Sequence, residues 1–299
     1  MKIVVAGGSG FVGKKLTTLL HNDGHEVVIL TRGKSRMEKG MQFVQWLSKE
    51  ADPVAEIRYA DAFVNLAGVS LNSGRWTEKK KHEIYASRMQ ATSTLIDMMT
   101  QLSQPPKVLV NASAVGIYPA SQHMIYTEED KIFSQDFLGS TVRDWERMAN
   151  RAQALNVRVA TGRFGVILGK DGGALPLMAL PYRYYVGGPV GSGKQWLSWV
   201  HVDDVARALY FAITTPELIG PFNVTAPHPL RMADFVQVLS DVLHKPNWLA
   251  VPSFVLQIAL GEQSKLVLEG QHVVPQQLEK HGFEFKYPTA QQALENIYA

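Results

Sequence analysis

The chain has 299 residues, which exceeds one ordinary domain of about 100–200 residues and allows a sizeable core. Hydrophobic residues make up 46% and charged residues 19%, values typical of a globular protein that leave little room for disorder or coiled coil. The net charge of only +3, with dispersed lysine and arginine, argues against a nucleic-acid surface, and the absence of cysteine excludes disulfides and thiolate metal sites.

Strand-like apolar runs alternate with helical segments through the first two thirds of the chain. The clearest helical periods cover residues 10–22, 77–102 and 138–154. Continuous apolar strands separated by helices are typical of a parallel sheet covered on both faces, so the sequence predicts a doubly wound α/β fold of the Rossmann type. The predicted strands are residues 3–6, 26–30, 62–66, 108–111 and 157–161.

The residue composition changes after residue 169. Glycine pairs at 172–173 and 187–188, with prolines and tyrosines between them, predict loops on the substrate side. Helical patterns return at residues 232–243 and 253–269. We therefore expect a Rossmann domain over residues 1–169 and a smaller α/β substrate lobe over residues 170–299. Parts of residues 195–225 are expected to return to the Rossmann sheet.

A glycine-rich turn follows the first predicted strand and opens a helix, with the sequence Gly7-Gly8-Ser9-Gly10-Phe11-Val12-Gly13. In such a turn one glycine permits the tight bend, another lets the backbone approach a pyrophosphate, and the last lets the helix pack on the strand. Free N–H groups and the helix dipole then hold the anion. The alternative is a structural turn without a ligand. The residues expected to bind a dinucleotide are Gly7, Gly10, Phe11, Val12 and Gly13.

The end of the second predicted strand indicates which dinucleotide is preferred. A ribose 2′-hydroxyl is bound by a carboxylate at this point, whereas a 2′-phosphate is bound by arginine. Here the strand ends on Thr31 and Arg32 with no acidic residue, and Arg36 adds positive charge nearby. The sequence therefore predicts NADP, with an ordinary basic surface loop as the alternative.

Several further motifs together cover nearly the whole chain. They include Asn65-Leu66-Ala67-Gly68, the run from Asn111 to Tyr118, and His201-Val202-Asp203-Asp204. With the glycine-rich turn, they resemble the extended short-chain dehydrogenase/reductases. The glycine runs at 172–173 and 187–193 and the tail at 268–275 narrow the resemblance to the atypical, nucleoside-diphosphate-sugar epimerase-like family with a C-terminal domain of unknown function.

The resemblance implies cofactor contacts beyond the turn. Carried over by position, they fall on Thr31, Arg32, Leu66, Ala67, Glu83 and Arg88, with Gly68 completing the Asn-x-Ala-Gly element. Glu83 and Arg88 lie on the long predicted helix, where solvated surface charges are the alternative.

The usual catalytic pair of this superfamily is missing. Its tyrosine exchanges a proton with the substrate and its lysine, four residues later, lowers the tyrosine pKa. The aligned positions hold Leu138 and Val142, and none of the ten tyrosines is followed by lysine at the fourth position. Ser113 matches the serine that hydrogen-bonds the substrate oxygen, with a strand-end cap as the alternative.

A substitute proton donor is therefore needed if the protein is an active enzyme. Tyr118, five residues beyond Ser113, is the best candidate and Tyr126 a weaker one, although aromatic packing explains either. His201 with Asp203 and Asp204 forms too local a cluster to predict a metal site, and no Gly-x-Ser-x-Gly elbow surrounds Ser113.

The sequence thus favours an NADP-dependent oxidoreductase or epimerase-like enzyme of unknown small-molecule substrate. A non-catalytic NADP(H)-sensing or scaffold protein is the rival interpretation, because the tyrosine and lysine are absent. No apolar stretch approaches the ~18 residues that span a bilayer, so we expect a cytoplasmic protein without nucleic-acid or membrane partners. The sequence is also compatible with a homodimer.

Overall fold

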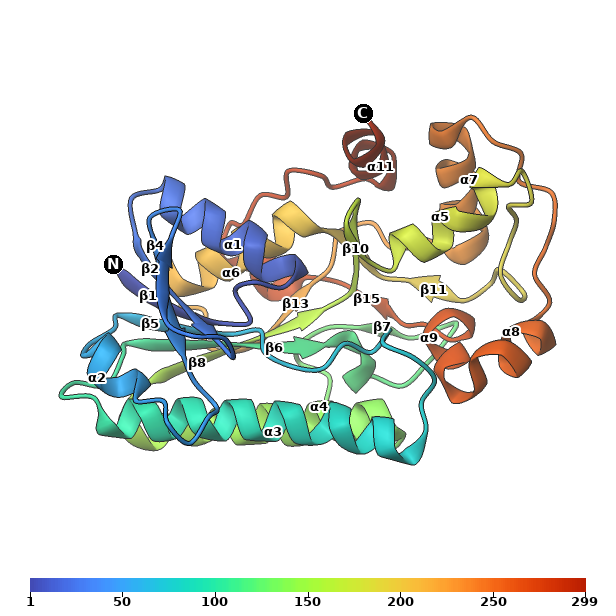
Figure 1. The fold of residues 1–299 in the computed structure, drawn as a ribbon. Coiled ribbons are helices and arrows are strands. Elements are labelled where there is room, and N and C mark those ends of the chain that lie inside the picture. Colours follow the sequence, from blue (N-terminus) through green and yellow to red (C-terminus); the bar gives the residue numbers. More distant parts are fainter.

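The computed structural model describes residues 1–299. Its main sheet has the strand order β13-β8-β6-β5-β1-β2-β4-β3, and all neighbours are parallel except β3, which pairs with β4 in antiparallel fashion (Figure 1). This arrangement confirms the predicted doubly wound fold. The strands are β1 (Lys2–Ala6), β2 (Glu26–Thr31), β3 (Arg36–Glu38), β4 (Met41–Gln45), β5 (Ala62–Asn65), β6 (Val108–Ala114), β8 (Arg158–Phe164) and β13 (Gly220–Val224).

Helices cover both faces of this sheet (Figure 1). The helices α1 (Phe11–Asn22) and α6 (Val202–Thr214) pack together on one face, where Leu16, Leu20 and Leu209 are fully buried. The other face carries α3 (Glu78–Gln101), with Leu95 and Met99 fully buried, and α4 (Phe137–Asn150), with Ala149 fully buried. The strands are buried on both sides, which explains their continuous apolar sequences. The short helices α2 (Pro53–Ile57), η1 (Val115–Ile117) and η2 (Arg151–Leu155) complete this half.

A second core lies beyond the carboxyl ends of the strands and includes Tyr182, Trp199, Phe235 and Leu294. It is enclosed by α5 (Leu175–Arg183), α7 (Met232–Leu243) and α11 (Ala290–Tyr298). The prediction of loops after residue 169 was wrong for α5: Pro176 occupies the first turn, where proline is tolerated, and Pro181 lies near the end. The small sheets are β10 (Gly172–Gly173), β9 (Val166–Gly169) and β12 (Trp199–His201), and β11 (Trp196–Leu197) with β14 (Leu230–Arg231).

The segment predicted as one helix over residues 253–269 is interrupted. It consists of α8 (Ser253–Leu260), a 3₁₀ turn η3 (Gly261–Ser264) and α9 (Lys265–Leu268). Gly261 has a φ of 60°, a left-handed conformation that ends α8. The remaining elements are β7 (Ile125–Tyr126), which pairs with β15 (His272–Val273), and α10 (Gln276–Lys280).

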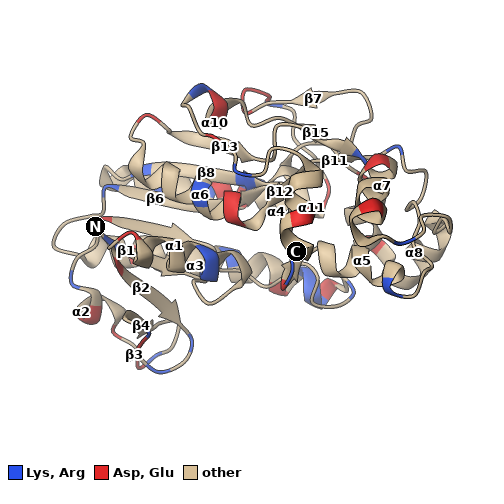
Figure 2. Ribbon diagram, turned by 90° about the horizontal axis from the view of Figure 1, so that it is seen from above, with Lys and Arg blue, Asp and Glu red and all other residues tan.

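The two parts of the chain interleave. β13 is the edge strand of the main sheet beside β8, and α6 precedes it, so residues 202–224 belong structurally to the first half. Basic and acidic residues are interspersed along the elements (Figure 2). None of the helices combines the length and the apolar character needed to cross a membrane.

Candidate active site

The glycine-rich turn between β1 and α1 is built by close backbone contacts. Gly7 has a φ of 78°, and a Cβ there would lie 2.7 Å from the backbone carbonyl of Leu66. A Cβ on Gly13 would lie 2.2 Å from the carbonyl oxygen of Gly7. A Cβ on Gly10 would meet nothing nearer than that same oxygen, at 3.2 Å, so Gly10 borders open space. Glycine at 7 and 13 is therefore required for packing, whereas Gly10 keeps the approach to the turn clear.

The N-terminus of α1 fits a pyrophosphate. Its N-cap is Gly10, which has no side chain to accept a hydrogen bond, whereas Thr77 caps α3 and Asp136 caps α4 through their side chains. The first N–H groups of α1, at Phe11 and Val12, are thus left for an anion. The Phe11 ring packs against the glycines of β10, which links the turn to the second core.

The two arginines predicted to bind a 2′-phosphate, Arg32 and Arg36, have different environments after β2. Thr31 accepts a hydrogen bond from the Gly33 backbone N–H through Oγ1 at 3.1 Å and so shapes the turn. Arg32 follows on the surface and makes no hydrogen bond or ion pair. Arg36 instead pairs with Glu38, Nε to Oε2 at 2.9 Å, and stacks on Phe43 with 4.1 Å to the ring centre. Arg32 is therefore the guanidinium free to meet a 2′-phosphate.

The end of β5 is fixed by buried amides. Asn65 donates through Nδ2 to Asn111 Oδ1 at 2.7 Å and to Thr92 Oγ1 at 2.9 Å, while its Oδ1 accepts from the Ala67 N–H at 3.2 Å. These bonds hold the backbone of Leu66 and Ala67 beside Gly7, which is where the sequence predicted a border of the cofactor site.

Arg88 supports the same segment from α3. Its Nη1 donates to the carbonyl oxygens of Val69 at 3.1 Å and Ile84 at 2.9 Å, and its guanidinium lies over the Trp145 ring. No carboxylate pairs with it, and burial lowers its pKa to about 10. A Cβ on Gly68 would press on this guanidinium at 3.2 Å. Glu83 is engaged with Lys80 of the same helix at 3.3 Å.

Ser113 belongs to a buried polar cluster that we call the Ser113 cluster, made of Ser113, Glu146, Arg163 and Tyr118. Ser113 Oγ donates to Glu146 Oε1 at 2.6 Å. The Arg163 guanidinium donates to both carboxylate oxygens of Glu146, at 2.8 and 2.9 Å. Ser113 and Arg163 are register partners on β6 and β8, so their side chains leave the same face of the sheet, which α4 covers. The ion pair stabilises the charged form of Arg163 and raises its pKa despite burial.

Tyr118 lies deeper in this cluster. Its hydroxyl accepts from Arg163 Nη1 at 2.8 Å and lies 2.9 Å from the Thr127 carbonyl and 3.0 Å from Asn223 Oδ1. The residue is 0% exposed and stacks on the equally buried Tyr126, and burial raises the pKa of its phenol. The structure thus brings Ser113 and Tyr118 into one network, but it encloses the hydroxyl that we expected to meet a substrate.

Sequence reasoning missed Glu146 and Arg163. Glu146 lies eight residues after Leu138 and four after Val142 on α4, so the three share one helix face. The signal available in the sequence was the acidic residue Glu146, which lies four residues after Val142, the position of the missing lysine. Of these side chains, Val142 is buried, and 13% of the Glu146 side chain stays exposed.

A second buried carboxylate, Glu128, lies beyond Tyr118 and is linked to it through Asn223. Its Oε1 accepts from the backbone N–H groups of Asn223 at 2.7 Å and Gln277 at 3.2 Å, while Oε2 is buried without any partner. Burial therefore raises the pKa of Glu128 above its ordinary value.

The His201 motif has a structural role. Asp204 is fully buried and accepts from the backbone N–H groups of Lys286 and Tyr287, and it also pairs with Arg207. His201 Nδ1 accepts from the Asp203 N–H and so caps α6. These contacts tie the C-terminal segment to the main sheet.

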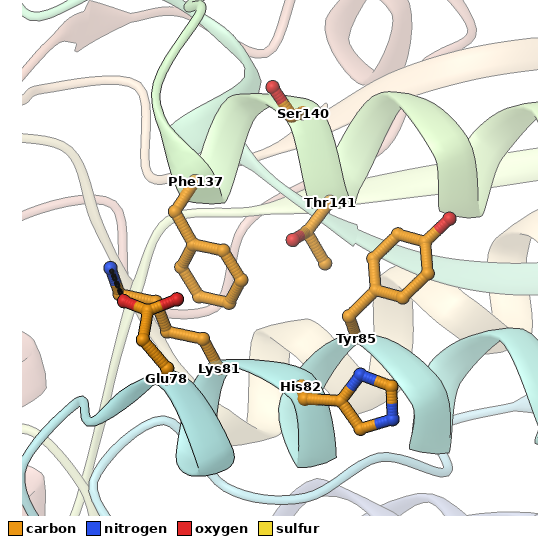
Figure 3. A pocket seen from close by; sticks show the side chains of 7 residues that line it. All are labelled: Glu78, Lys81, His82, Tyr85, Phe137, Ser140 and Thr141. Atoms are coloured by element: carbon orange, nitrogen blue, oxygen red, sulfur yellow. Dashed lines mark hydrogen bonds and ion pairs between the residues drawn. The ribbon is translucent and has the colours of Figure 1, made fainter.

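A shallow pocket of about 410 Å³ lies apart from this site, between the first turns of α3 and α4 (Figure 3). Lys81 and Tyr85 of α3 face Phe137 and Thr141 of α4 across it. All of its lining residues come from α3 and α4, and none belongs to the glycine-rich turn or to the Ser113 cluster.

The architecture is a Rossmann-like nucleotide-binding fold, and the glycine-rich turn is typical of the short-chain dehydrogenase/reductase type. The chain belongs to the NAD dependent epimerase/dehydratase family, whose model matches residues 3–225, and a domain of unknown function (DUF1731) matches residues 251–297. The resemblance inferred from the motifs is thereby confirmed.

Relatives match over nearly their whole length. The chain is 43% identical to the epimerase family protein YfhF of Bacillus subtilis, covering 100% of this chain and 98% of that protein. It is 34% identical to human epimerase family protein SDR39U1, solved with NADPH, with a TM-score of 0.89 and coverage of 100% and 99%. A Thermus thermophilus UDP-glucose 4-epimerase in complex with NAD, at 18% identity and a TM-score of 0.79, shares the fold.

Proposed function

We propose that this chain is an NADP(H)-dependent oxidoreductase or epimerase-like enzyme acting on a small molecule. The observation that carries the cofactor assignment is the unpaired, exposed Arg32 at the tip of β2, where the strand ends on Thr31 and not on the carboxylate that would bind a ribose 2′-hydroxyl. The solved human relative, which holds NADPH, supports the same choice. Gly7, Gly10, Gly13 and the N-terminus of α1 would hold the pyrophosphate, and Leu66 and Ala67 would border the dinucleotide.

The bound nicotinamide would supply hydride transfer, so the chain itself must handle only a proton. We assign this task to Ser113 and Glu146 in place of the missing tyrosine and lysine. A substrate hydroxyl gives its proton to Ser113 Oγ while the Ser113 proton passes to Glu146 Oε1 across 2.6 Å. Arg163 holds the carboxylate in place, and Tyr118 acts through Arg163 as a positioning residue.

Cofactor preference is the first test. Calorimetry should show that NADPH binds more tightly than NADH, and Arg32→Ala should erode this preference. Losing one charge-assisted contact of roughly 1.5–3 kcal/mol lowers NADPH affinity about ten- to a hundred-fold. Arg36→Ala is the matched control, because Arg36 is engaged with Glu38. Equal affinity of the unmodified protein for NADPH and NADH would refute the assignment.

The absent tyrosine and the enclosed Tyr118 hydroxyl favour the rival function, a non-catalytic NADP(H) sensor. Loss of NADPH absorbance in a screen of carbonyl compounds would identify an oxidoreductase. An epimerase returns the hydride, so it would be identified by a changed stereocentre in the recovered compound, whereas a sensor would show neither change. With a substrate found, Ser113→Ala should lower turnover roughly 10²–10³-fold with unchanged NADPH affinity. Full activity of that variant would remove Ser113 from the mechanism.

A further inference from the structure

A helical hairpin in the C-terminal half is fixed at its base. It consists of α8, η3 and α9, residues 253–268, and we call it the flap. Both of its ends meet at Gly191, where a Cβ would lie 3.0 Å from Ser253 Oγ and 2.9 Å from Leu268 Cδ2. The buried Gln195 holds the same region, because its Nε2 donates to the Val267 carbonyl oxygen at 2.9 Å. The base of the flap is therefore well packed against residues 191–195.

The turn η3 forms the tip of the flap and contacts the other half of the molecule. Gln263 Nε2 donates to the Leu71 carbonyl oxygen at 3.0 Å, and Glu262 pairs with Lys81 near the start of α3. We call these two contacts the latch. The Arg75 guanidinium lies beside the C-terminal end of α8, where a positive charge is favourable. The tip thus rests on α3 and on the loop that follows β5.

The flap contributes almost nothing to the core. Of residues 253–268, only Ser264 is buried. Burial of apolar surface is what chiefly fixes a segment, whereas an accessible ion pair or a single hydrogen bond contributes little. The side chains of Lys81 and Glu262 stay 18% and 33% exposed. The tip is therefore held by contacts that local motion can break without disturbing a core.

The flap lies on the side of the molecule where doubly wound folds bind their ligands, outside the carboxyl ends of the strands. Figure 1 shows α8 and α9 beyond these strand ends and beside the start of α3. The base of the flap belongs to the C-terminal half, and its tip rests on the first half. The flap therefore bridges the two halves on the ligand side.

The loop that carries the latch begins at the predicted border of the dinucleotide. Leu71 lies five residues after Leu66, and Val69 between them is fixed to α3. The Val69 N–H donates to Ser87 Oγ at 3.1 Å, and its carbonyl oxygen accepts from Arg88 at 3.1 Å. A dinucleotide at this border would order the segment that supplies the latch acceptor. Cofactor binding should therefore favour the latched flap.

We propose that the flap is a hinged gate. Its tip stays latched while NADP(H) is bound, and it swings away from the loop after β5 to admit and release the ligands of this site. Motion about a packed base that breaks only a few polar contacts is a hinge motion. This inference rests on the proposed function, because NADP(H) is the ligand expected to bias the flap.

The hinge is tested by distance measurements on the full-length protein. The chain contains no cysteine, so two introduced cysteines are the only sites for nitroxide spin labels. Ile258→Cys labels the flap at a position 73% exposed, and Ile219→Cys labels the edge of the main sheet at a position 63% exposed. Double electron–electron resonance should give a latched and an open separation, and saturating NADPH should reduce the open population. The control pair, Ile219→Cys with Lys79→Cys on α3, lies outside the flap and should give one separation.

Matched alanine variants assign the opening to the latch. Glu262→Ala removes the ion pair of the flap, whereas Glu78→Ala removes the other partner of the same lysine, which lies within α3 at 3.1 Å. The open population should rise about two- to fivefold in Glu262→Ala and should not rise in Glu78→Ala. Combining Glu262→Ala with Gln263→Ala should raise it roughly tenfold. A single separation throughout, or equal open populations in all variants, would mean a rigid wall and would overturn the inference.

Stopped-flow release of NADPH, followed by the fluorescence of the cofactor, tests the gate itself. Because release requires the open flap, its rate constant should rise about two- to fivefold in Glu262→Ala and not in Glu78→Ala. An unchanged rate in a variant whose flap opens more often would overturn the gate. Failure of the unmodified protein to bind NADPH would instead refute the proposed function, and the separations measured without cofactor would still test the hinge.

Discussion

The glycine-rich turn and the Ser113 cluster lie at the same edge of one sheet, but different parts of the chain determine them. The turn is a backbone feature: Gly7, Gly10 and Gly13 act because they lack side chains, and the contacts that require glycine there lie within the turn or at its neighbour Leu66. The Ser113 cluster is a side-chain feature assembled from β6, α4, β8 and the segment around Tyr118. Local spacing therefore reveals the first and says little about the second.

The largest expected effect tests the backbone site. Gly10→Val should abolish detectable NADPH binding while the protein stays folded, because the added Cβ meets only the Gly7 oxygen within the protein and the branched side chain fills the approach of the pyrophosphate. Calorimetry gives the binding and circular dichroism the fold. Gly116→Ala, at a glycine with 3.8 Å of clearance, is the control. Normal NADPH affinity in Gly10→Val would mean that the phosphate site is elsewhere.

Substitutions in the Ser113 cluster should lower the free energy of unfolding. Glu146→Gln leaves the buried Arg163 without its counter-ion, and removing one partner of a buried pair costs about 3–5 kcal/mol of unfolding free energy. Arg147→Ala breaks the exposed pair with Asp144 on the same helix and should cost about 0–1 kcal/mol. Urea denaturation measures both. Equal losses of unfolding free energy in the two variants would mean that the Glu146–Arg163 pair contributes no more than an exposed ion pair. That result would contradict the role given to burial in the Ser113 cluster.

The smallest effect concerns pH. Because burial raises the folded-state pKa of Glu128 above its unfolded value, the folded state holds the proton more tightly. Its contribution to stability is complete below the unfolded pKa and is lost as pH rises through the folded pKa. The difference in unfolding free energy between wild type and Glu128→Gln should therefore shift against the wild type over this window. A difference that is constant with pH would contradict a raised pKa.

The sequence predicted most of the main sheet and its helices, since buried parallel strands and amphipathic helices have strong periodic patterns. It missed α5, whose two prolines imitate a loop, and the break at Gly261, which depends on one left-handed residue. It proposed Ser113 as a candidate but not Glu146, because a hydrogen bond across 33 residues has no local signature. The enclosure of Tyr118 likewise follows from tertiary packing that sequence distance cannot report.

A crystal structure of the protein with NADPH tests the central claim most directly. The account predicts the pyrophosphate on the N-terminus of α1, the 2′-phosphate at Arg32, and the nicotinamide ring beside Ser113 with the Ser113–Glu146–Arg163 contacts intact. A nicotinamide ring bound away from Ser113, or a Glu146 side chain turned out of the cluster, would contradict the assignment of proton transfer to this pair.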